Sequence, residues 1–247
     1  MKINDVDINY IEYGNKKGST ILLLHGWGQN IEMMKFIGDE FQKTNNILIV
    51  DLPGHGSSTE PSYPWEVIDF VNCIREILER LKIVKVTIIG HSFGGKIALL
   101  YASLYKVDKL VLFGSPFKKE IQELSTRTKV LKGIKKALKP IPILNKFENF
   151  AKKHIGSEDY KNASPMMRDI LVNTVNLDIT DDLINISSPT LMIWGTLDKE
   201  VPIDRAYELE KLIKDSGVVE YPTGTHYAYL ENKVQTIKVL KSFLGGS

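Results

Sequence analysis

Short, continuous apolar runs recur along the chain and constrain its fold more than any other feature. Runs of this length are typical of strands buried on both faces, as in a parallel sheet. Amphipathic helical patterns occupy the segments between them. This alternation predicts an α/β fold, with a mostly parallel sheet and helices on both of its faces. The apolar runs are residues 21–24, 47–50, 86–89, 110–113, 190–194 and 218–221. The helical patterns are residues 65–81, 96–105, 203–213 and 234–244, and residues 3–13 alternate loosely, as in a pair of strands.

One long stretch departs from this alternation. Residues 118–187 contain several helical patterns and no clear strand. Within it, Ser164 followed by Pro165 is typical of a helix start, with serine as the N-cap and proline at the first helical position. A helical stretch of this length between two strands is too long for an ordinary loop. We therefore predict a core domain of residues 1–117 and 188–247, with a helical cap of residues 118–187 inserted into it.

The sequence GHSFG at residues 90–94 carries the strongest chemical signal. It lies directly between an apolar run and a helical pattern. In this strand–turn–helix context a GxSxG sequence is typical of a nucleophile elbow, whose strained turn exposes the serine hydroxyl. The helix behind the turn offers backbone N–H groups and its positive dipole end. We predict Ser92 as a nucleophile, and the alternative is a purely structural glycine turn.

A serine nucleophile needs a base, and the base needs an acid that orients it. In folds with this kind of elbow, the acid and then the histidine follow the serine along the chain. Asp198 follows the apolar run 190–194, and His226 follows the run 218–221. Both are expected in loops at the carboxyl edge of the sheet, where ligands bind. The alternatives are a turn or cap aspartate and a surface-loop histidine.

Two backbone N–H groups are expected to hold the oxyanion of an acyl-transfer reaction. The first belongs to Phe93, the residue after the predicted nucleophile. The second is expected from the loop after the run 21–24, which reads HGWG at residues 25–28, and we assign it to Trp27. The glycines around Trp27 allow an unusual backbone path. The alternative for this loop is a plain glycine turn.

Composition excludes several other classes. Lys and Arg number 32 against 30 Asp and Glu, so the charge of +2 does not favour a nucleic-acid binder. The histidines lack paired metal-ligand spacing, and no nucleotide-binding glycine motif is present, so we expect no metal and no cofactor. Cys73 is the one cysteine, which is compatible with a reducing compartment. No signal peptide or membrane-spanning run is evident, and we expect a cytoplasmic protein.

Together these motifs resemble the α/β-hydrolase superfamily over residues 3–244. The matching pieces are HGWG at 25–28, DLPGHG at 51–56, the elbow around Ser92, Asp198 and His226. The chain looks like the capped group that contains small carboxylesterases, monoglyceride lipases, C–C bond hydrolases and cofactor-free haloperoxidases. The resemblance implies a mostly parallel eight-stranded sheet with the cap after the sixth strand. It also implies Ser92 as nucleophile, His226 as base and Asp198 as acid, and a serine at the elbow argues against dehalogenases.

The predicted cap contains a strongly basic segment. Residues 125–153 hold nine Lys and Arg against one acid, with apolar residues at helical spacing among them. This pattern is typical of a solvated cap face, which we favour, and also of a helix that lies on an anionic membrane surface. A second apolar stripe contains Met166, Met167, Leu171 and Val175, and is expected to pack the cap over the site. The predicted substrate pocket is formed by Trp27, Phe117, Met166, Met167 and Tyr227.

The predicted function is hydrolysis of carboxylic esters with small to medium acyl chains, through an acyl-enzyme on Ser92. The fold alone does not fix the reaction. The same three residues also suit C–C bond or thioester hydrolysis, perhydrolysis or a biosynthetic lyase step, and a ligand receptor on a hydrolase scaffold is a further alternative. We expect a small-molecule ester as substrate and no nucleic-acid partner. The sequence does not indicate an oligomeric state.

Overall fold

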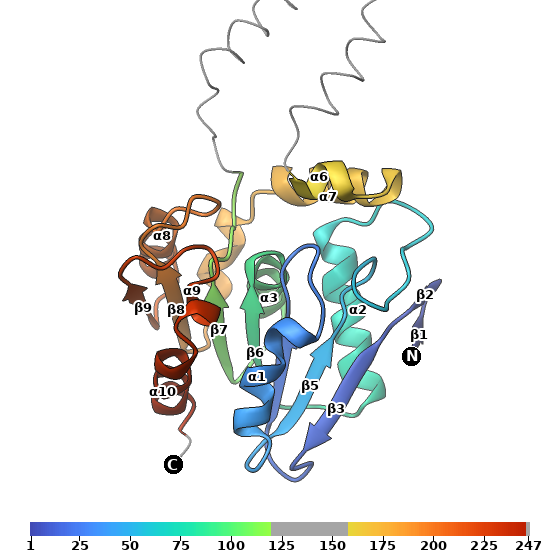
Figure 1. The fold of residues 1–247 in the computed structure, drawn as a ribbon. Coiled ribbons are helices and arrows are strands. Elements are labelled where there is room, and N and C mark those ends of the chain that lie inside the picture. The colour runs from blue at the N-terminus through green and yellow to red at the C-terminus, as the bar shows by residue number, and fades with distance from the viewer. Residues whose placement is uncertain (120–157, 246–247) are drawn as a thin grey trace, which may run out of the picture.

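The computed structural model describes residues 1–119 and 158–245. Seven strands form the main sheet, and all neighbouring pairs are parallel except the pair at one edge, where β3 runs antiparallel to β5. In spatial order the strands are β3 (Tyr10–Gly14), β5 (Asn46–Val50), β4 (Thr20–Leu24), β6 (Val86–His91), β7 (Lys109–Phe113), β8 (Thr190–Gly195) and β9 (Ser216–Tyr221) (Figure 1). The mostly parallel α/β sheet predicted from the sequence is therefore confirmed.

The number of strands in this sheet differs from the expected eight. In the described residues the start of the chain forms a separate two-stranded sheet, in which β1 (Lys2–Ile3) pairs with β2 (Val6–Asp7). The turn between them places Asn4 at a φ of 51°, a left-handed conformation that asparagine tolerates better than most residues. Because each of these strands pairs only with the other, the main sheet of the described residues has seven strands rather than eight.

Side chains on the strands alternate between two hydrophobic cores, one on each face of the sheet. Leu22 and Leu24 of β4 point into one core, whereas Ile21 and Leu23 point into the other. The first core is covered by α2 (Val67–Arg80), α3 (Ser92–Leu104) and α8 (Asp204–Leu212). The second is covered by α1 (Glu32–Phe41), α9 (Ala228–Glu231) and α10 (Lys233–Leu244). Burial on both faces explains why the strands read as continuous apolar runs.

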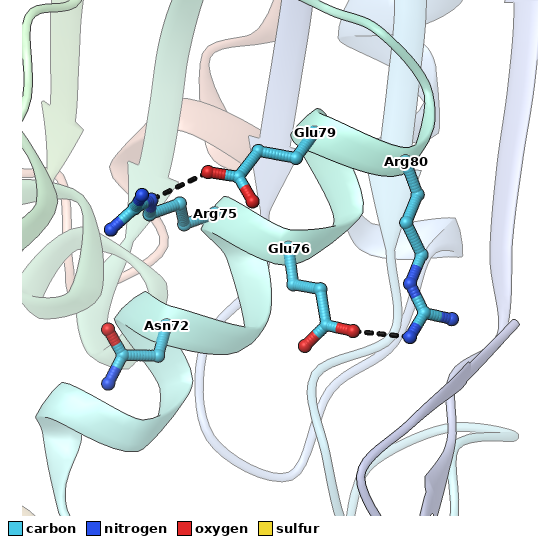
Figure 2. A pocket seen from close by; sticks show the side chains of 5 residues that line it. All are labelled: Asn72, Arg75, Glu76, Glu79 and Arg80. Atoms are coloured by element: carbon cyan, nitrogen blue, oxygen red, sulfur yellow. Dashed lines mark hydrogen bonds and ion pairs between the residues drawn. The ribbon is translucent and has the colours of Figure 1, made fainter.

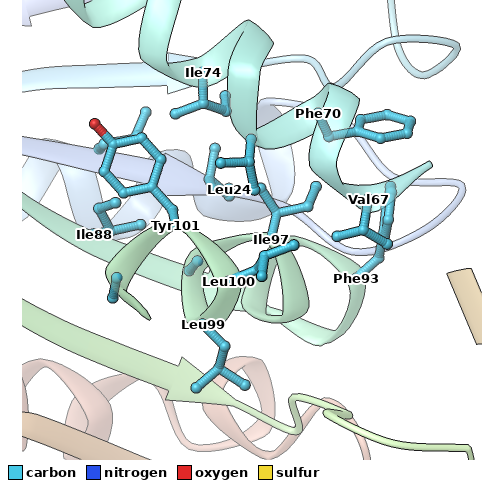
Figure 3. Close-up of a cluster of buried hydrophobic side chains, with 14 of the residues drawn as sticks. Leu24, Val67, Phe70, Ile74, Ile88, Phe93, Ile97, Leu99, Leu100 and Tyr101 are labelled. Atoms are coloured by element: carbon cyan, nitrogen blue, oxygen red, sulfur yellow. The ribbon is translucent and has the colours of Figure 1, made fainter. Parts of the chain in front are cut away.

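The pair α2 and α3 forms the centre of the first core (Figure 3). Helix α2 begins with a capping box, in which the side chains of Glu66 and Asp69 each accept from the other residue's backbone N–H. The ring of Phe70 on α2 packs edge to face against the ring of Phe93, with 5.0 Å between the ring centroids. Burying an aromatic or aliphatic side chain of this kind contributes about 1.5–3 kcal/mol. This packing fixes the start of α3, the helix that carries Ser92.

Part of the predicted cap is described. It consists of α6 (Glu158–Asn162), α7 (Pro165–Asn176) and the 3₁₀ helix η1 (Thr180–Asn185). Helices α6 and α7 lie across one end of the molecule, above the strand ends (Figure 1). Ser164 caps α7 as predicted, because its side chain accepts a hydrogen bond from the Met167 N–H and proline follows it. The basic segment 125–153 lies outside the described residues, and the division into core and cap stays a prediction.

The face that α7 turns toward the core differs from the predicted stripe. Met167, Ile170 and Thr174 are its buried residues, at the spacing of one helix face. Met166 is half-buried, whereas Val175 is 48% exposed. The expected stripe is thus wrong at Val175, because the buried face continues through Thr174 instead.

A buried lysine joins this helix to the core. Lys96 of α3 is 1% exposed, and its Nζ donates to the backbone oxygens of Thr174 at 2.7 Å and Leu177 at 2.6 Å. These oxygens lie at the end of α7, where carbonyls lack partners within the helix and the dipole favours a cation. Lys96 therefore attaches the end of α7 to the helix that begins at Ser92. In the described part of the chain, no helix is long and apolar enough to cross a membrane.

Candidate active site

The predicted elbow is a sharp turn from β6 into α3. Ser92 has a φ of 50°, which costs a non-glycine residue about 1–3 kcal/mol and is typical of functional turns. Two glycines make the turn possible. A Cβ at Gly90 would lie 2.6 Å from the Gly94 oxygen, and a Cβ at Gly94 would lie 2.5 Å from the His25 oxygen. The strand–turn–helix context that the motif requires is therefore present, and Ser92 is half-buried.

Asp198 and His226 form a buried pair at the neighbouring strand ends. His226 Nδ1 lies 2.8 Å from Asp198 Oδ2, and each residue is 6% exposed. The other carboxylate oxygen, Oδ1, accepts from the backbone N–H groups of Glu200 and Val201, both at 2.9 Å. These bonds fix the carboxylate so that Oδ2 accepts a hydrogen bond from Nδ1–H, which leaves His226 Nε2 as the basic nitrogen.

The charge around His226 favours its protonated form. Burial by itself lowers the pKa of His226, but the hydrogen bond and charge of Asp198 and the charges of Glu200 and Asp159 outweigh it, so the pKa lies above its usual 6.5. Glu200 Oε2 is 3.5 Å from Nε2. An imidazole that takes up a proton readily is suited to act as a general base.

His91 brings the elbow and the histidine loop together. Its ring centroid lies 4.8 Å from that of His226, and its Nε2 is 3.1 Å from the His226 backbone oxygen. Since His91 directly precedes Ser92, these contacts bring the predicted nucleophile and base to the same edge of the sheet, although β7 and β8 lie between their strands. The hydrogen bonds of the described residues do not include one between Ser92 Oγ and His226 Nε2, a contact that often tightens only when substrate binds.

The predicted oxyanion donors lie on two loops that are joined directly. The Gly94 N–H donates to the His25 oxygen at 3.1 Å, which fixes the Trp27 loop against the elbow. The rings of Trp27 and Phe93 lie 5.3 Å apart. Phe93 is in the first turn of α3, where N–H groups lack partners within the helix. Among the described residues, the Trp27 N–H has no acceptor. Both N–H groups are therefore candidates to receive an oxyanion.

None of the other described histidines has a carboxylate at hydrogen-bond distance, and Asp51 Oδ1 lies 4.0 Å from His25 Nε2. His25 bridges two loops, with Nδ1 2.7 Å from the Gly26 oxygen and Nε2 accepting from the Leu52 N–H at 3.0 Å. Burial lowers the pKa of His25 to about 4 and that of His91 well below its usual value. His154 lies outside the described residues. The buried, neutral rings of His25 and His91 organise turns instead.

A cavity of about 300 Å³ opens beside the Trp27 loop. It lies between the loop that follows β5 and the start of α7. Its wall includes Trp27, Gly54, His55, Glu60, Asp159 and Met167. Of the five residues predicted for the substrate pocket, Trp27 and Met167 therefore line this cavity.

The other three predicted pocket residues lie elsewhere. Phe117 is fully buried in the first core, where its ring is covered on all sides. Met166 is half-buried and packs against the same core. Tyr227 is 37% exposed, and its ring lies 5.6 Å from that of His226. Phe117 thus packs in the core and does not line the cavity.

A second hollow, of about 550 Å³, lies on the outer surface of α2 and has a different character. Figure 2 shows its side chains, in which Arg75 pairs with Glu79 and Arg80 pairs with Glu76 along the helix. These charges neutralise each other, and exposed pairs of this kind are typical of a solvated helix face. Among the described residues, no group of three or more His, Cys, Asp or Glu is placed to hold a metal ion.

Sequence reasoning missed two residues of the site. Gly114, directly after β7, has a φ of 51°, and a Cβ there would lie 2.9 Å from His226 Nδ1. A glycine immediately after an apolar run was the available signal for this close approach. Glu200 was missed because its position two residues after Asp198 has no motif of its own.

Comparison with known proteins shows what this chain is similar to. The family described as the α/β-hydrolase fold matches residues 19–133. An AB hydrolase superfamily protein from Bacillus subtilis, YisY, is 26% identical over 260 residues, which cover 92% of this chain and 91% of that protein. A pimeloyl-[acyl-carrier protein] methyl ester esterase from Aliivibrio fischeri is 24% identical, over 92% of this chain and 94% of that protein. The chain has the α/β-hydrolase fold, and its sequence is similar to members of that superfamily.

Solved structures agree on the fold. The meta-cleavage product hydrolase from Pseudomonas fluorescens IP01 superposes with a TM-score of 0.73 at 22% identity, over 98% of this chain and 95% of that one. That likeness concerns the arrangement of the sheet and its helices. The reaction of this chain has to be argued from its own side chains.

Proposed function

We propose that this chain is a serine hydrolase that cleaves carboxylic esters of small to medium acyl chains. The observation that carries the proposal is the buried His226–Asp198 pair, with its 2.8 Å bond, beside a serine held at a φ of 50°. This arrangement supplies a nucleophile, a base with a defined tautomer and a fixed carboxylate. Asp198 positions the imidazole and stabilises its charge after proton transfer.

The reaction would proceed in two halves. His226 Nε2 takes the Ser92 proton as Oγ attacks the ester carbonyl, and the imidazolium then returns that proton to the departing alcohol. An acyl group remains on Ser92. Water, deprotonated by the same histidine, attacks this acyl-enzyme and releases the carboxylic acid with the serine restored.

The oxyanion formed in each half would be held by the backbone N–H groups of Trp27 and Phe93. A donor of this kind typically accounts for about 10²–10³-fold in rate. The cavity of about 300 Å³ next to Trp27 supports substrates of limited size. The name of the Aliivibrio relative, a methyl ester esterase, supports ester cleavage. A cytoplasmic location and a small-molecule substrate stay predictions from the sequence.

The test is steady-state hydrolysis of p-nitrophenyl esters from acetyl to palmitoyl. Wild type, Ser92→Ala and the matched control Ser103→Ala, a serine further along the same helix, are measured together. We expect turnover with an optimum at short or medium chains and a loss of about 10⁴-fold in Ser92→Ala only. Substantial steady turnover in Ser92→Ala would remove Ser92 from the mechanism. If the wild type hydrolyses none of these esters, ester hydrolysis is not its reaction, and Ser92, Asp198 and His226 would have to serve another one.

A further inference from the structure

The groups around the Gly26 carbonyl determine where the predicted oxyanion donor on Trp27 points. The Trp27 N–H belongs to the same peptide unit as that carbonyl, and in a planar trans peptide the two groups point in opposite directions. The Gly26 oxygen is held by two donors, His25 Nδ1 at 2.7 Å and the Gln29 N–H at 3.3 Å. His25 Nδ1 carries the proton, because Nε2 accepts from the Leu52 N–H. These two donors therefore set the direction of the Trp27 N–H.

Gln29 holds Gly26 with its side chain as well as with its backbone. Its Oε1 accepts a hydrogen bond from the Gly26 N–H at 3.0 Å, so one residue fixes the peptide units on both sides of Gly26. Gly28 has a φ of 68°, the left-handed conformation that lets the chain turn back between Trp27 and Gln29. A Cβ at Gly26 would lie 3.2 Å from Gln29 Oε1, so the turn is tightly packed. The path of the backbone at Trp27 thus depends on a single amide side chain.

The Gln29 side chain also lies against the other two parts of the candidate site. Its Oε1 is 3.3 Å from Nδ1 of His91, the residue directly before Ser92. His91 Nε2 is in turn 3.1 Å from the backbone oxygen of His226. Burial raises the pKa of Tyr227, the residue after His226, and a side-chain hydrogen bond with Gln29 opposes that shift. One side chain therefore joins the predicted oxyanion loop to the elbow and to the histidine loop.

The side chain and the N–H of Trp27 are held by different groups. The Trp27 ring lies between those of His55, at 4.7 Å, and Phe93, at 5.3 Å, which keeps it beside the elbow. Its N–H has no acceptor among the described residues and is open to a ligand. Because the ring contacts leave the peptide plane undetermined, the hydrogen bonds around Gly26 decide whether this N–H can meet an oxyanion.

We propose that Gln29 is a positioning residue, which aligns the Trp27 N–H with the oxyanion that forms when Ser92 attacks the substrate. It acts through the Gly26–Trp27 peptide and not on the substrate itself. The proposal deepens the proposed function and rests on it. The oxyanion is present in the tetrahedral intermediate and absent from the bound ester, so a misaligned donor lowers kcat and leaves KM nearly unchanged.

The first experiment replaces Gln29 by methionine, an unbranched side chain of similar length whose thioether is only a weak acceptor. For the p-nitrophenyl ester that wild type cleaves fastest, we expect Gln29→Met to lower kcat about 10–100-fold, as for other misplaced groups in active sites. KM should stay within about 2-fold of its wild-type value. Active sites are counted with a p-nitrophenyl phosphonate, which bonds to the serine oxygen and releases p-nitrophenol, so unfolded protein does not enter kcat.

The matched control is the same substitution at another half-buried glutamine. Gln42 directly follows α1, at the opposite end of that helix from the Trp27 loop, and its Nε2 donates to the Asp39 oxygen at 2.9 Å. Gln42→Met therefore also removes one side-chain hydrogen bond to the backbone, and it should keep the wild-type kcat and KM. Equal kcat in Gln29→Met and Gln42→Met would overturn the proposal.

A pair of inhibitors separates alignment of the donor from general damage to the site. When a trifluoromethyl ketone binds, Ser92 Oγ bonds to its carbonyl carbon, the serine proton passes to His226, and the carbonyl oxygen becomes an anion in the place of the oxyanion. The methyl ketone of the same chain length binds mainly without this addition. We expect Gln29→Met to reduce the preference for the fluorinated ketone about 10–100-fold, and Gln42→Met to retain it. Equal weakening of both ketones would overturn the proposal.

The outcomes distinguish this proposal from the proposed function. If wild type hydrolyses no ester, or if Ser92→Ala keeps its turnover, the proposed function fails and the role of Gln29 fails with it. If wild type is active and Ser92→Ala is not, but Gln29→Met raises KM with kcat unchanged, the positioning role alone is overturned and the hydrolase remains. A fall in kcat with KM unchanged, together with the loss of preference for the fluorinated ketone, supports both.

Discussion

The two sides of the candidate site are built in different ways. On the core side, Ser92, Asp198 and His226 stand on loops at strand ends, where glycines allow backbone segments to approach within van der Waals distance. On the cap side, α6 and α7 are held by single side chains, such as Lys96 beneath α7 and the Ser164–Glu60 hydrogen bond. The comparison teaches that the predicted reacting groups depend on backbone geometry, whereas the cap side of the cavity wall depends on a few polar contacts.

The largest effect is expected on the core side, from Asp198→Asn. An amide in this position no longer fixes the Nδ1 proton of His226, so the histidine loses its basic tautomer. We expect kcat to fall by about 10⁴-fold, while the fold is preserved because the amide oxygen can still accept from Glu200 and Val201. Ester kinetics and thermal unfolding measure the two parts. A near-normal rate would place the acid elsewhere.

A second change probes the backbone itself. In Gly114→Ala the added methyl would lie 2.9 Å from His226 Nδ1, at a φ of 51° that alanine rarely adopts. We expect the imidazole to be displaced and kcat to drop by about 100-fold. Gly217→Ala is the matched control, since a Cβ there meets nothing within 4 Å. Equal kinetics in the two variants would contradict the close fit of His226 against β7.

The cap side is tested by Lys96→Met. This variant leaves the Thr174 and Leu177 oxygens without their cationic donor and should lower the free energy of unfolding by about 1–3 kcal/mol. The ester KM should rise more than kcat falls, because α7 carries part of the cavity wall. Urea unfolding and ester kinetics are compared with Lys85→Met, an exposed lysine. A change in kcat alone would show that Lys96 serves the reacting groups instead.

The smallest effect concerns pH. The base must be unprotonated, so activity should fall as the pH drops through the His226 pKa, which lies above 6.5. Glu200→Gln removes a negative charge 3.5 Å from Nε2 and should move this acid limb to lower pH. Glu210→Gln, an exposed glutamate of α8, is the control. The kcat/KM profile between about pH 5 and 8 measures the shift, and an unchanged limb would remove Glu200 from the site.

The sheet was predictable because its strands are buried on both faces and therefore leave apolar runs in the sequence. The elbow was predictable because a serine on a tight turn requires glycines at fixed spacing. Helix α1 was not predicted. Its interruption by Gly38 lowers helix propensity, yet a Cβ there would lie 2.4 Å from the Tyr13 hydroxyl, a long-range contact that no local pattern reports.

The cavity was the least predictable part. Its wall joins residues from the Trp27 loop, the segment after β5 and the start of α7, which are far apart in the sequence. Phe117 illustrates the difficulty, since an aromatic residue after a strand suits a pocket and a core equally well. The burial of Phe117 in the structure decides for the core, and its sequence position alone does not reveal that burial.

The position of Lys96 has a mechanical consequence. It lies one helical turn after Ser92 on the same helix, and it holds the far end of α7 through two backbone oxygens. Any force that lifts α7 away from the cavity is therefore transmitted through this lysine to the helix that carries Ser92. A mutation of Lys96 should therefore disturb the cavity wall and the position of Ser92 together.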